Sequence, residues 1–288
     1  MRIDIGAGVR LFVDVEGAGW RRVEDRLEPK PTLLLLHGGP GMDHSGYRSF
    51  FGDFADVAQV VYYDHRGNGR SDRDDPARWT LDVWADDVVR LCDALGVESP
   101  IVLGNSFGGM VAMAYAARHP DHPGGLVLSS TAATHDRAQI VTRFTELGGD
   151  DVGAAADRFW SDPASADVLE YLSVCGPHYT QSEGNLFDDR STIVSAEVLQ
   201  HWGSGEGQRF DLLAGLASIR CPTLLLAGRL DPVCPIEGMT RIADRVPERH
   251  RHFVVFDDCG HGVFRDAPDR ARAELRRFIG VVTGTGAA

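Results

Sequence analysis

A single serine stands between glycines in the segment Gly104-Asn105-Ser106-Phe107-Gly108, directly after an apolar run. This is the spacing G-x-S-x-G, in which the serine occupies a tight turn from a strand into a helix and can act as a nucleophile. Glycine is required on both sides because a Cβ atom there would collide with neighbouring backbone. The alternative is a serine that only caps the helix. The apolar run before the motif and the helix-forming residues after it favour the nucleophile.

A serine hydroxyl is a poor nucleophile unless a neighbouring base takes its proton. Among the 11 histidines, His261 fits this role best, because it lies between two glycines just after the last predicted strand. Asp231 ends the strand before it, where a carboxylate would hold the imidazole in the correct tautomer. The alternatives are a structural histidine and a turn aspartate before Pro232. The sequence therefore predicts a catalytic triad in the chain order Ser106, Asp231, His261.

Acyl transfer also needs backbone N–H groups that stabilise the negative charge developing on the carbonyl oxygen. One donor is expected from Phe107, the residue after the nucleophile. The second is expected from the segment HGGPG at residues 37–41, which follows another apolar run. Pro40 has no N–H group, so Gly39 is the first candidate and Gly38 the next.

The elements that must position these residues alternate between buried strands and helices. Apolar runs typical of strands covered on both faces occur within TLLLLHGGPG (32–41), VAQVVYYDHRGNGRSD (57–72), IVLGNSFGGMVA (101–112), GGLVLSSTAA (124–133), PTLLLAGRLDP (222–232) and RHFVVFDDCGHGVF (251–264). Helical spacing of apolar residues predicts a helix over 81–95 with Thr80 as its N-cap. The charged segment 20–31 is predicted to be a loop. This order indicates an α/β protein with a doubly wound, mostly parallel sheet.

One stretch interrupts the alternation. Residues 134–208 are acidic and rich in helix formers, and they contain no convincing buried strand. The simplest explanation is a helical cap inserted into a core domain formed by residues 1–133 and 209–288.

Composition excludes several classes of function. The chain has 288 residues and a formal net charge of −13, which disfavours binding to nucleic acid or to an anionic membrane surface. Five scattered cysteines without a CxxC pair, and a beginning without a signal peptide, predict a cytoplasmic protein. No HExxH, paired-cysteine or GxGxxG pattern is present, so neither a metal nor an organic cofactor is expected. The oligomeric state is left open.

These motifs resemble those of the α/β-hydrolase fold family, and the resemblance extends over nearly the whole chain. The segment YDHRGNGRSD at 63–72 follows the strand after the HGGPG loop. It is similar to the family's usual segment at that place, which mainly stabilises the loop architecture. The loop HGGPG is most similar to the proline iminopeptidase branch, whose members remove an N-terminal residue from short peptides. In that branch a helical cap covers the site, and 134–208 matches it in place and size.

The same resemblance implies candidates for substrate binding. Proline iminopeptidases anchor the substrate amine with glutamates late in the cap, where this chain has Glu197 and, as a second candidate, Glu206. Solvated surface charge is the alternative for both. The elbow departs from that branch at Asn105 and Phe107, and the residue after Asp231 is a proline.

Three functions therefore stay open. The first is a proline iminopeptidase-like serine hydrolase acting on short peptides or aminoacyl amides. The second is a carboxylesterase or lactonase, for which Phe144, Trp160 and Trp202 of the cap would form an apolar pocket, unless they only pack the cap. The third is a protein that binds a small ligand on the same fold without turning it over.

Overall fold

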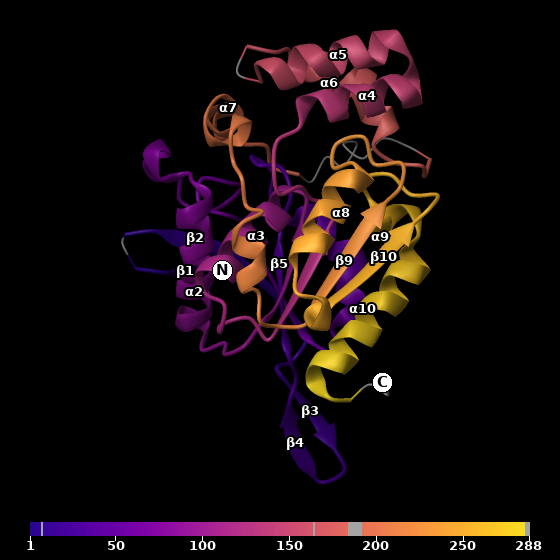
Figure 1. Ribbon diagram of the computed structural model, residues 1–288. Coiled ribbons are helices and arrows are strands. Elements are labelled where there is room, and N and C mark those ends of the chain that lie inside the picture. The colour runs from indigo at the N-terminus through magenta and orange to yellow at the C-terminus, as the bar shows by residue number, and fades with distance from the viewer. Residues whose placement is uncertain (7, 164, 184–191, 286–288) are drawn as a thin grey trace.

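The protein is built around a mixed sheet of eight strands (Figure 1). The computed structural model describes residues 1–6, 8–163, 165–183 and 192–285. The sheet has the order β1-β2-β6-β5-β7-β8-β9-β10. The pairs β1–β2 and β2–β6 are antiparallel, and all the other pairs are parallel. Its strands are β1 (Arg2–Asp4), β2 (Arg10–Glu16), β5 (Thr32–Leu36), β6 (Gln59–Tyr63), β7 (Ile101–Asn105), β8 (Gly125–Ser129), β9 (Thr223–Gly228) and β10 (Arg251–Phe256).

Helices cover both faces of this sheet. One apolar core joins the sheet to α2 (Leu81–Leu95), α3 (Phe107–Arg118) and α8 (Ile236–Arg245), and a second joins it to α1 (Arg48–Phe51), α9 (Val263–Asp266) and α10 (Pro268–Thr283). Alternate residues of β5 point into the two cores, because successive side chains of a strand face opposite ways. Short 3₁₀ helices occupy 45–47, 52–54, 76–78, 176–178, 206–208, 215–218 and 248–250.

The predicted doubly wound sheet is confirmed in its details. Residues 33–36 of β5 are buried, as a strand covered on both faces requires. Helix α2 begins after Thr80, whose hydroxyl accepts a hydrogen bond from the Val83 amide at 3.3 Å. It ends at Gly96, which has the left-handed conformation typical of a helix C-cap.

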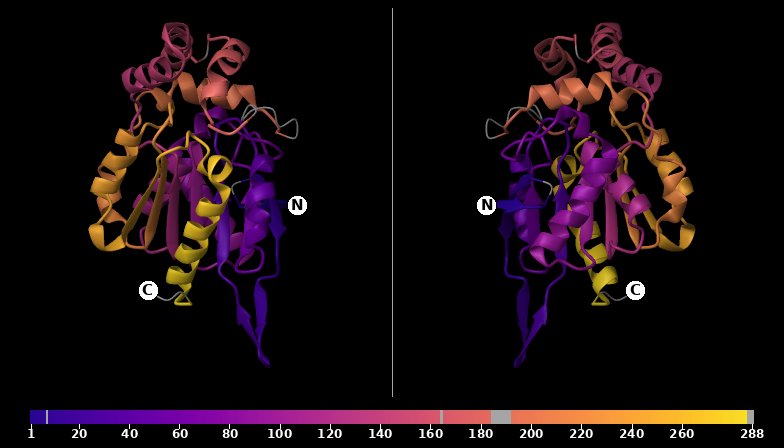
Figure 2. Two further views of the ribbon diagram at one scale, coloured as in Figure 1. Left: turned by 90° about the vertical axis from the view of Figure 1, so that its right-hand side faces the viewer. Right: turned by 90° about the vertical axis from the view of Figure 1, so that its left-hand side faces the viewer.

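The charged segment 20–31 was predicted as a loop, and this prediction is wrong. The structure has a hairpin of β3 (Trp20–Val23) and β4 (Arg26–Pro29) there, joined by a turn in which Glu24 has a φ of 54°. The hairpin projects from the end of the molecule opposite the inserted helices (Figure 2). Among the described strands these two pair only with each other, so they do not need the apolar residues by which buried strands are recognised.

The predicted helical insertion lies over the carboxyl ends of the parallel strands (Figure 1). It contains α4 (Arg137–Gly148), α5 (Asp150–Ser161), α6 (Val168–Cys175) and α7 (Ala196–Ser204). At its base, Thr134 forms an isolated antiparallel bridge with Asp211, so the two ends of the insertion lie side by side. Residues 164 and 184–191 of the predicted cap lie outside the described part of the chain.

The helices of the insertion belong to two packing units. Helices α4, α5 and α6 share an apolar cluster that includes Phe144, Phe159 and Tyr171. Helix α7 instead buries Val198 and Trp202 in the core cluster of the sheet. Leu199 of the same helix packs against the α4–α6 cluster, so α7 contacts the core and the rest of the insertion. In the described part of the chain, no helix is both long enough and apolar enough to cross a membrane.

Candidate active site

Ser106 lies on the tight turn between β7 and α3. Its backbone has φ 54° and ψ −121°, an unusual conformation for a residue with a side chain. A Cβ atom on Gly104 would overlap the carbonyl oxygen of Gly108, and one on Gly108 would overlap that of Leu36. The turn is held by a hydrogen bond of 3.0 Å from the Ser106 amide to the Ser129 carbonyl. The glycines thus permit the close approach of strand and helix that presents the serine.

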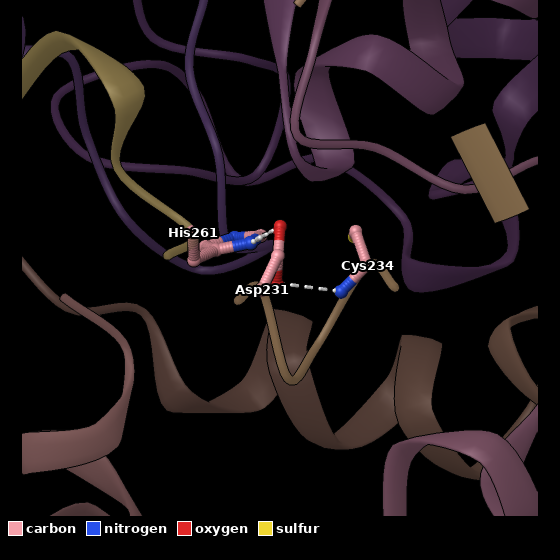
Figure 3. A group of neighbouring side chains, drawn as sticks. All are labelled: Asp231, Cys234 and His261. Carbon is pink, nitrogen blue, oxygen red and sulfur yellow. Dashed lines mark hydrogen bonds and ion pairs between the residues drawn. The ribbon is translucent and has the colours of Figure 1, made fainter. Parts of the chain in front are cut away.

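Asp231 and His261 are hydrogen-bonded to each other at the ends of β9 and β10. The His261 Nδ1 atom lies 2.9 Å from Asp231 Oδ2, and both side chains are buried (Figure 3). The other carboxylate oxygen accepts the amide N–H groups of Val233 at 2.9 Å and Cys234 at 2.8 Å. Because a carboxylate only accepts hydrogen bonds, Nδ1 is the donor in this pair, and in the neutral tautomer with that arrangement Nε2 carries the lone pair. That tautomer is the one a general base requires.

Cys234 is the third side chain of this group. One ligand-type atom from each of Asp231, Cys234 and His261 lies within 4.8 Å of the others. The carboxylate is already satisfied by two backbone amides and by Nδ1 of the imidazole. Burial, together with the charge of Asp231, raises the pKa of the Cys234 thiol well above its ordinary value. A metal ligand would have to be the thiolate, so these residues fit a hydrogen-bonded pair beside a neutral thiol better than a metal site.

The loop after β5 reaches the serine. A Cβ atom on Gly38 would lie 3.4 Å from the Cβ of Ser106. The Gly38 N–H group donates to the Tyr47 hydroxyl at 3.0 Å, and that hydroxyl donates to Asn105 Oδ1 at 2.9 Å. Across the residues that the structure describes, the N–H groups of Gly39 and Phe107 have no hydrogen-bond acceptor. Of the two glycines, Gly39 is therefore the one with a free donor.

His37 fixes the orientation of this loop, a role that was not predicted. Its Nε2 accepts the His65 amide N–H at 3.0 Å, so Nδ1 carries the proton and donates to the Gly38 carbonyl at 2.8 Å. Burial lowers the pKa of His37, which keeps it neutral. The C=O and N–H groups of a trans peptide point in opposite directions. The Gly39 N–H therefore points away from His37.

The three aromatic candidates of the insertion lie in different surroundings. Phe144 is fully buried within the α4–α6 cluster. Trp160 is half-buried and donates to the Tyr171 hydroxyl at 3.1 Å. Trp202 packs edge-on against Phe107, with ring centroids 5.3 Å apart. Of the three, Trp202 is the one in contact with a residue of the serine turn.

The two acidic candidates each have a partner. Glu197 is exposed and forms an ion pair of 3.1 Å with Arg73. Glu206 accepts the N–H group of Leu81 at 2.9 Å, at the first residue of α2. Burial raises the pKa of Glu206. Helix N-termini attract carboxylates, so this contact attaches the end of the insertion to the core.

Comparisons with known proteins give a consistent result. A family model described as the alpha/beta hydrolase fold matches residues 31–268. A 2-hydroxymuconate semialdehyde hydrolase from Pseudomonas sp. strain CF600 is 29% identical and covers 89% of this chain and 86% of its own length. A proline iminopeptidase from Levilactobacillus brevis is 28% identical, with 90% and 92% covered.

Solved structures agree on the fold. A proline iminopeptidase from Mycobacterium smegmatis superposes with a TM-score of 0.77 at 22% identity, over 98% of each chain. A thermophilic esterase from Thermogutta terrifontis gives 0.72 at 25% identity, also over 98% of each chain. The similarity to proline iminopeptidases that the sequence predicted is thereby confirmed, and it is accompanied by similarity to other hydrolases.

Proposed function

Because the chain belongs to the α/β-hydrolase fold family, we propose that it is a serine hydrolase that works through an acyl-enzyme. The observation that carries this proposal is the buried hydrogen bond of 2.9 Å between Asp231 and His261. This pair lies at the same edge of the sheet as Ser106, because β7, β9 and β10 are parallel and end there. In a doubly wound sheet this edge is where ligands bind.

The proposed reaction has two halves. Ser106 Oγ attacks the substrate carbonyl while His261 Nε2 takes its proton, and Asp231 stabilises the imidazolium. The N–H groups of Gly39 and Phe107 donate to the carbonyl oxygen as it becomes negative. The tetrahedral intermediate then expels the leaving group, which His261 protonates. A water molecule releases the acyl group by the same steps.

The first candidate substrate is the N-terminal residue of a short peptide, or an aminoacyl amide. The HGGPG loop and the relatives named proline iminopeptidases support this class. His261 would protonate the departing amine.

The second candidate is a small, largely apolar ester or lactone. It is favoured by the engagement of both acidic candidates: Glu197 with Arg73, and Glu206 with the start of α2. An amine would need a carboxylate that is free to pair with it. Trp202, which packs on Phe107, would form an apolar wall for such an acyl group.

A hydrolysis panel with matched acyl groups separates these classes. Proline and alanine naphthylamides would be assayed beside the p-nitrophenyl esters of the same amino acids, simple aliphatic esters and lactones. Turnover of the amides that disappears in Ser106→Ala supports the peptidase. Turnover of esters or lactones with inert amides excludes it and supports the second candidate. A wild-type protein that turns over none of these and resists a fluorophosphonate would instead be the non-catalytic binder.

A further inference from the structure

Asp266, at the end of α9, collects an unusual number of hydrogen bonds. Its Oδ2 accepts the amide N–H groups of Gly260 at 2.8 Å and Gln181 at 3.1 Å. Its Oδ1 accepts the Ser182 amide at 3.1 Å, the Ser182 hydroxyl at 3.0 Å and the Thr180 hydroxyl. Five donors on one carboxylate satisfy essentially all of its acceptor sites. Such a residue acts as a fixed point between the segments that contribute the donors.

Those donors come from two places that are distant in the sequence. Gly260 immediately precedes His261, and the other donors belong to residues 180–182 of the insertion. The two segments are also in direct contact, since the His261 amide donates to the Tyr179 carbonyl at 2.7 Å. A Cβ atom on Gly260 would lie 2.5 Å from that same carbonyl oxygen. The loop that carries His261 is therefore attached to the insertion through its backbone.

We propose that Asp266 is a positioning residue that couples the insertion to the catalytic base, an inference that rests on the proposed role of His261. Two carboxylates together position His261. Asp231 orients the imidazole ring, and Asp266 fixes the backbone from which the ring projects. Displacing a catalytic group by about 1 Å can cost on the order of 100-fold in rate. Loss of the Asp266 contacts therefore slows catalysis although Asp266 does not touch the substrate.

Two substitutions of Asp266 test this role against a matched control. Asp266→Ala removes every acceptor, and Asp266→Asn keeps one oxygen. The control is Asp269→Ala, because Asp269 is three residues away, is 99% exposed and pairs only with Arg272 among the described residues. The rate of labelling of Ser106 by a fluorophosphonate serves as the readout, and kcat and KM on the best substrate of the panel follow.

The expected results are graded. Asp266→Ala lowers the labelling rate and kcat by about 10- to 100-fold, with KM changed less than about threefold. Asp266→Asn falls between that variant and the wild type, and Asp269→Ala stays within about twofold of the wild type. If Asp266→Ala does not fold, Asp266→Asn carries the comparison. Wild-type rates in a folded Asp266→Asn, and in Asp266→Ala where it folds, would overturn the proposal.

A double-substitution cycle tests the coupling to the insertion itself. Thr180→Val removes one donor to Asp266 and leaves the Gly260 contact in place. If both residues act through the same contact, Thr180→Val slows labelling in the wild type but has less effect in the Asp266→Asn background. Equal fold-changes in both backgrounds would contradict the coupling.

The NMR signal of the His261 Nδ1–H proton separates a positioning role of Asp266 from a role in stability alone. The His261 Nδ1–H proton in its hydrogen bond to Asp231 should give a far-downfield signal in wild type and Asp269→Ala. In Asp266→Ala it should broaden or vanish at temperatures where circular dichroism shows the fold intact. A sharp, unshifted signal would oppose the inference. A wild-type protein that is never labelled would instead refute the proposed function, so the two failures are distinguishable.

Discussion

Two buried histidines should make the fold less stable at mildly acidic pH. The rings of His37 and His65 lie 4.3 Å apart beside the Gly38–Gly39 loop, and each residue is only 1% exposed. Burial is the main cause that lowers the pKa of both, and that of His65 is lowered well below its ordinary value. In the described structure the Nδ1 atom of His65 is buried without a hydrogen-bond partner. A proton added there would bring an unpaired charge into the core.

The sign and size of the effect follow from proton linkage. A histidine that stays neutral when folded binds fewer protons than the unfolded chain, so stability is complete above the ordinary pKa of about 6.5 and declines as pH falls below it. At pH 5.5 protonation stabilises the unfolded state by about 1.4 kcal/mol for each such histidine. His65 contributes this amount, and His37 contributes at most the same. Together the two histidines should lower the free energy of unfolding by about 1.4–2.8 kcal/mol between pH 7.5 and 5.5.

Urea unfolding at pH 7.5, 6.5 and 5.5 measures this loss, and a substitution isolates its source. His65→Phe keeps an aromatic ring beside Tyr63 and Phe107 but removes the titrating group. Its free energy of unfolding should fall by about 1.4 kcal/mol less than that of the wild type over this range. The control, His252→Gln, alters an exposed histidine and should follow the wild type. Identical pH dependence in the wild type and His65→Phe would refute the reasoning.

Three further outcomes are expected. Asp87→Ala removes the carboxylate that holds the buried guanidinium of Arg66 through two bonds of 2.7 Å, so the free energy of urea unfolding should fall by about 3–5 kcal/mol. Gly108→Ala places a methyl group against the Leu36 carbonyl, which should lower stability by about 1–3 kcal/mol in the same assay and slow fluorophosphonate labelling of Ser106. All five cysteines are buried, and burial raises the pKa of each thiol. Ellman's reagent should therefore label none of them in the native protein and all five in urea.

Much of the core could be predicted from the sequence because its physical causes are local. A strand that is buried on both faces needs a continuous apolar run, and 32–36 and 223–228 have one. The turn around Ser106 needs glycines at fixed offsets, so its spacing is visible in the sequence. These features are determined by neighbours within a few residues.

The features that were missed depend on which distant segments meet. Nothing near Asp266 indicates that residues 180–182 will donate to it, since that contact requires the insertion to fold back onto the segment that follows His261. The role of His37 likewise depends on the amide of His65, which lies just after the neighbouring strand β6. The attachment of α7 to the core through Trp202 is a third case. Such long-range partners cannot be predicted from the spacing of residues in the sequence.

The account depends most on Ser106, Asp231 and His261 acting together as one catalytic unit. The direct test is the rate at which a fluorophosphonate modifies Ser106, located by mass spectrometry, in the wild type and in folded His261→Ala and Asp231→Asn. Modification of the wild type at Ser106, slowed by at least about 10³-fold in both variants, is the predicted result. An unmodified wild type, or a His261→Ala variant modified as fast as the wild type, would contradict it.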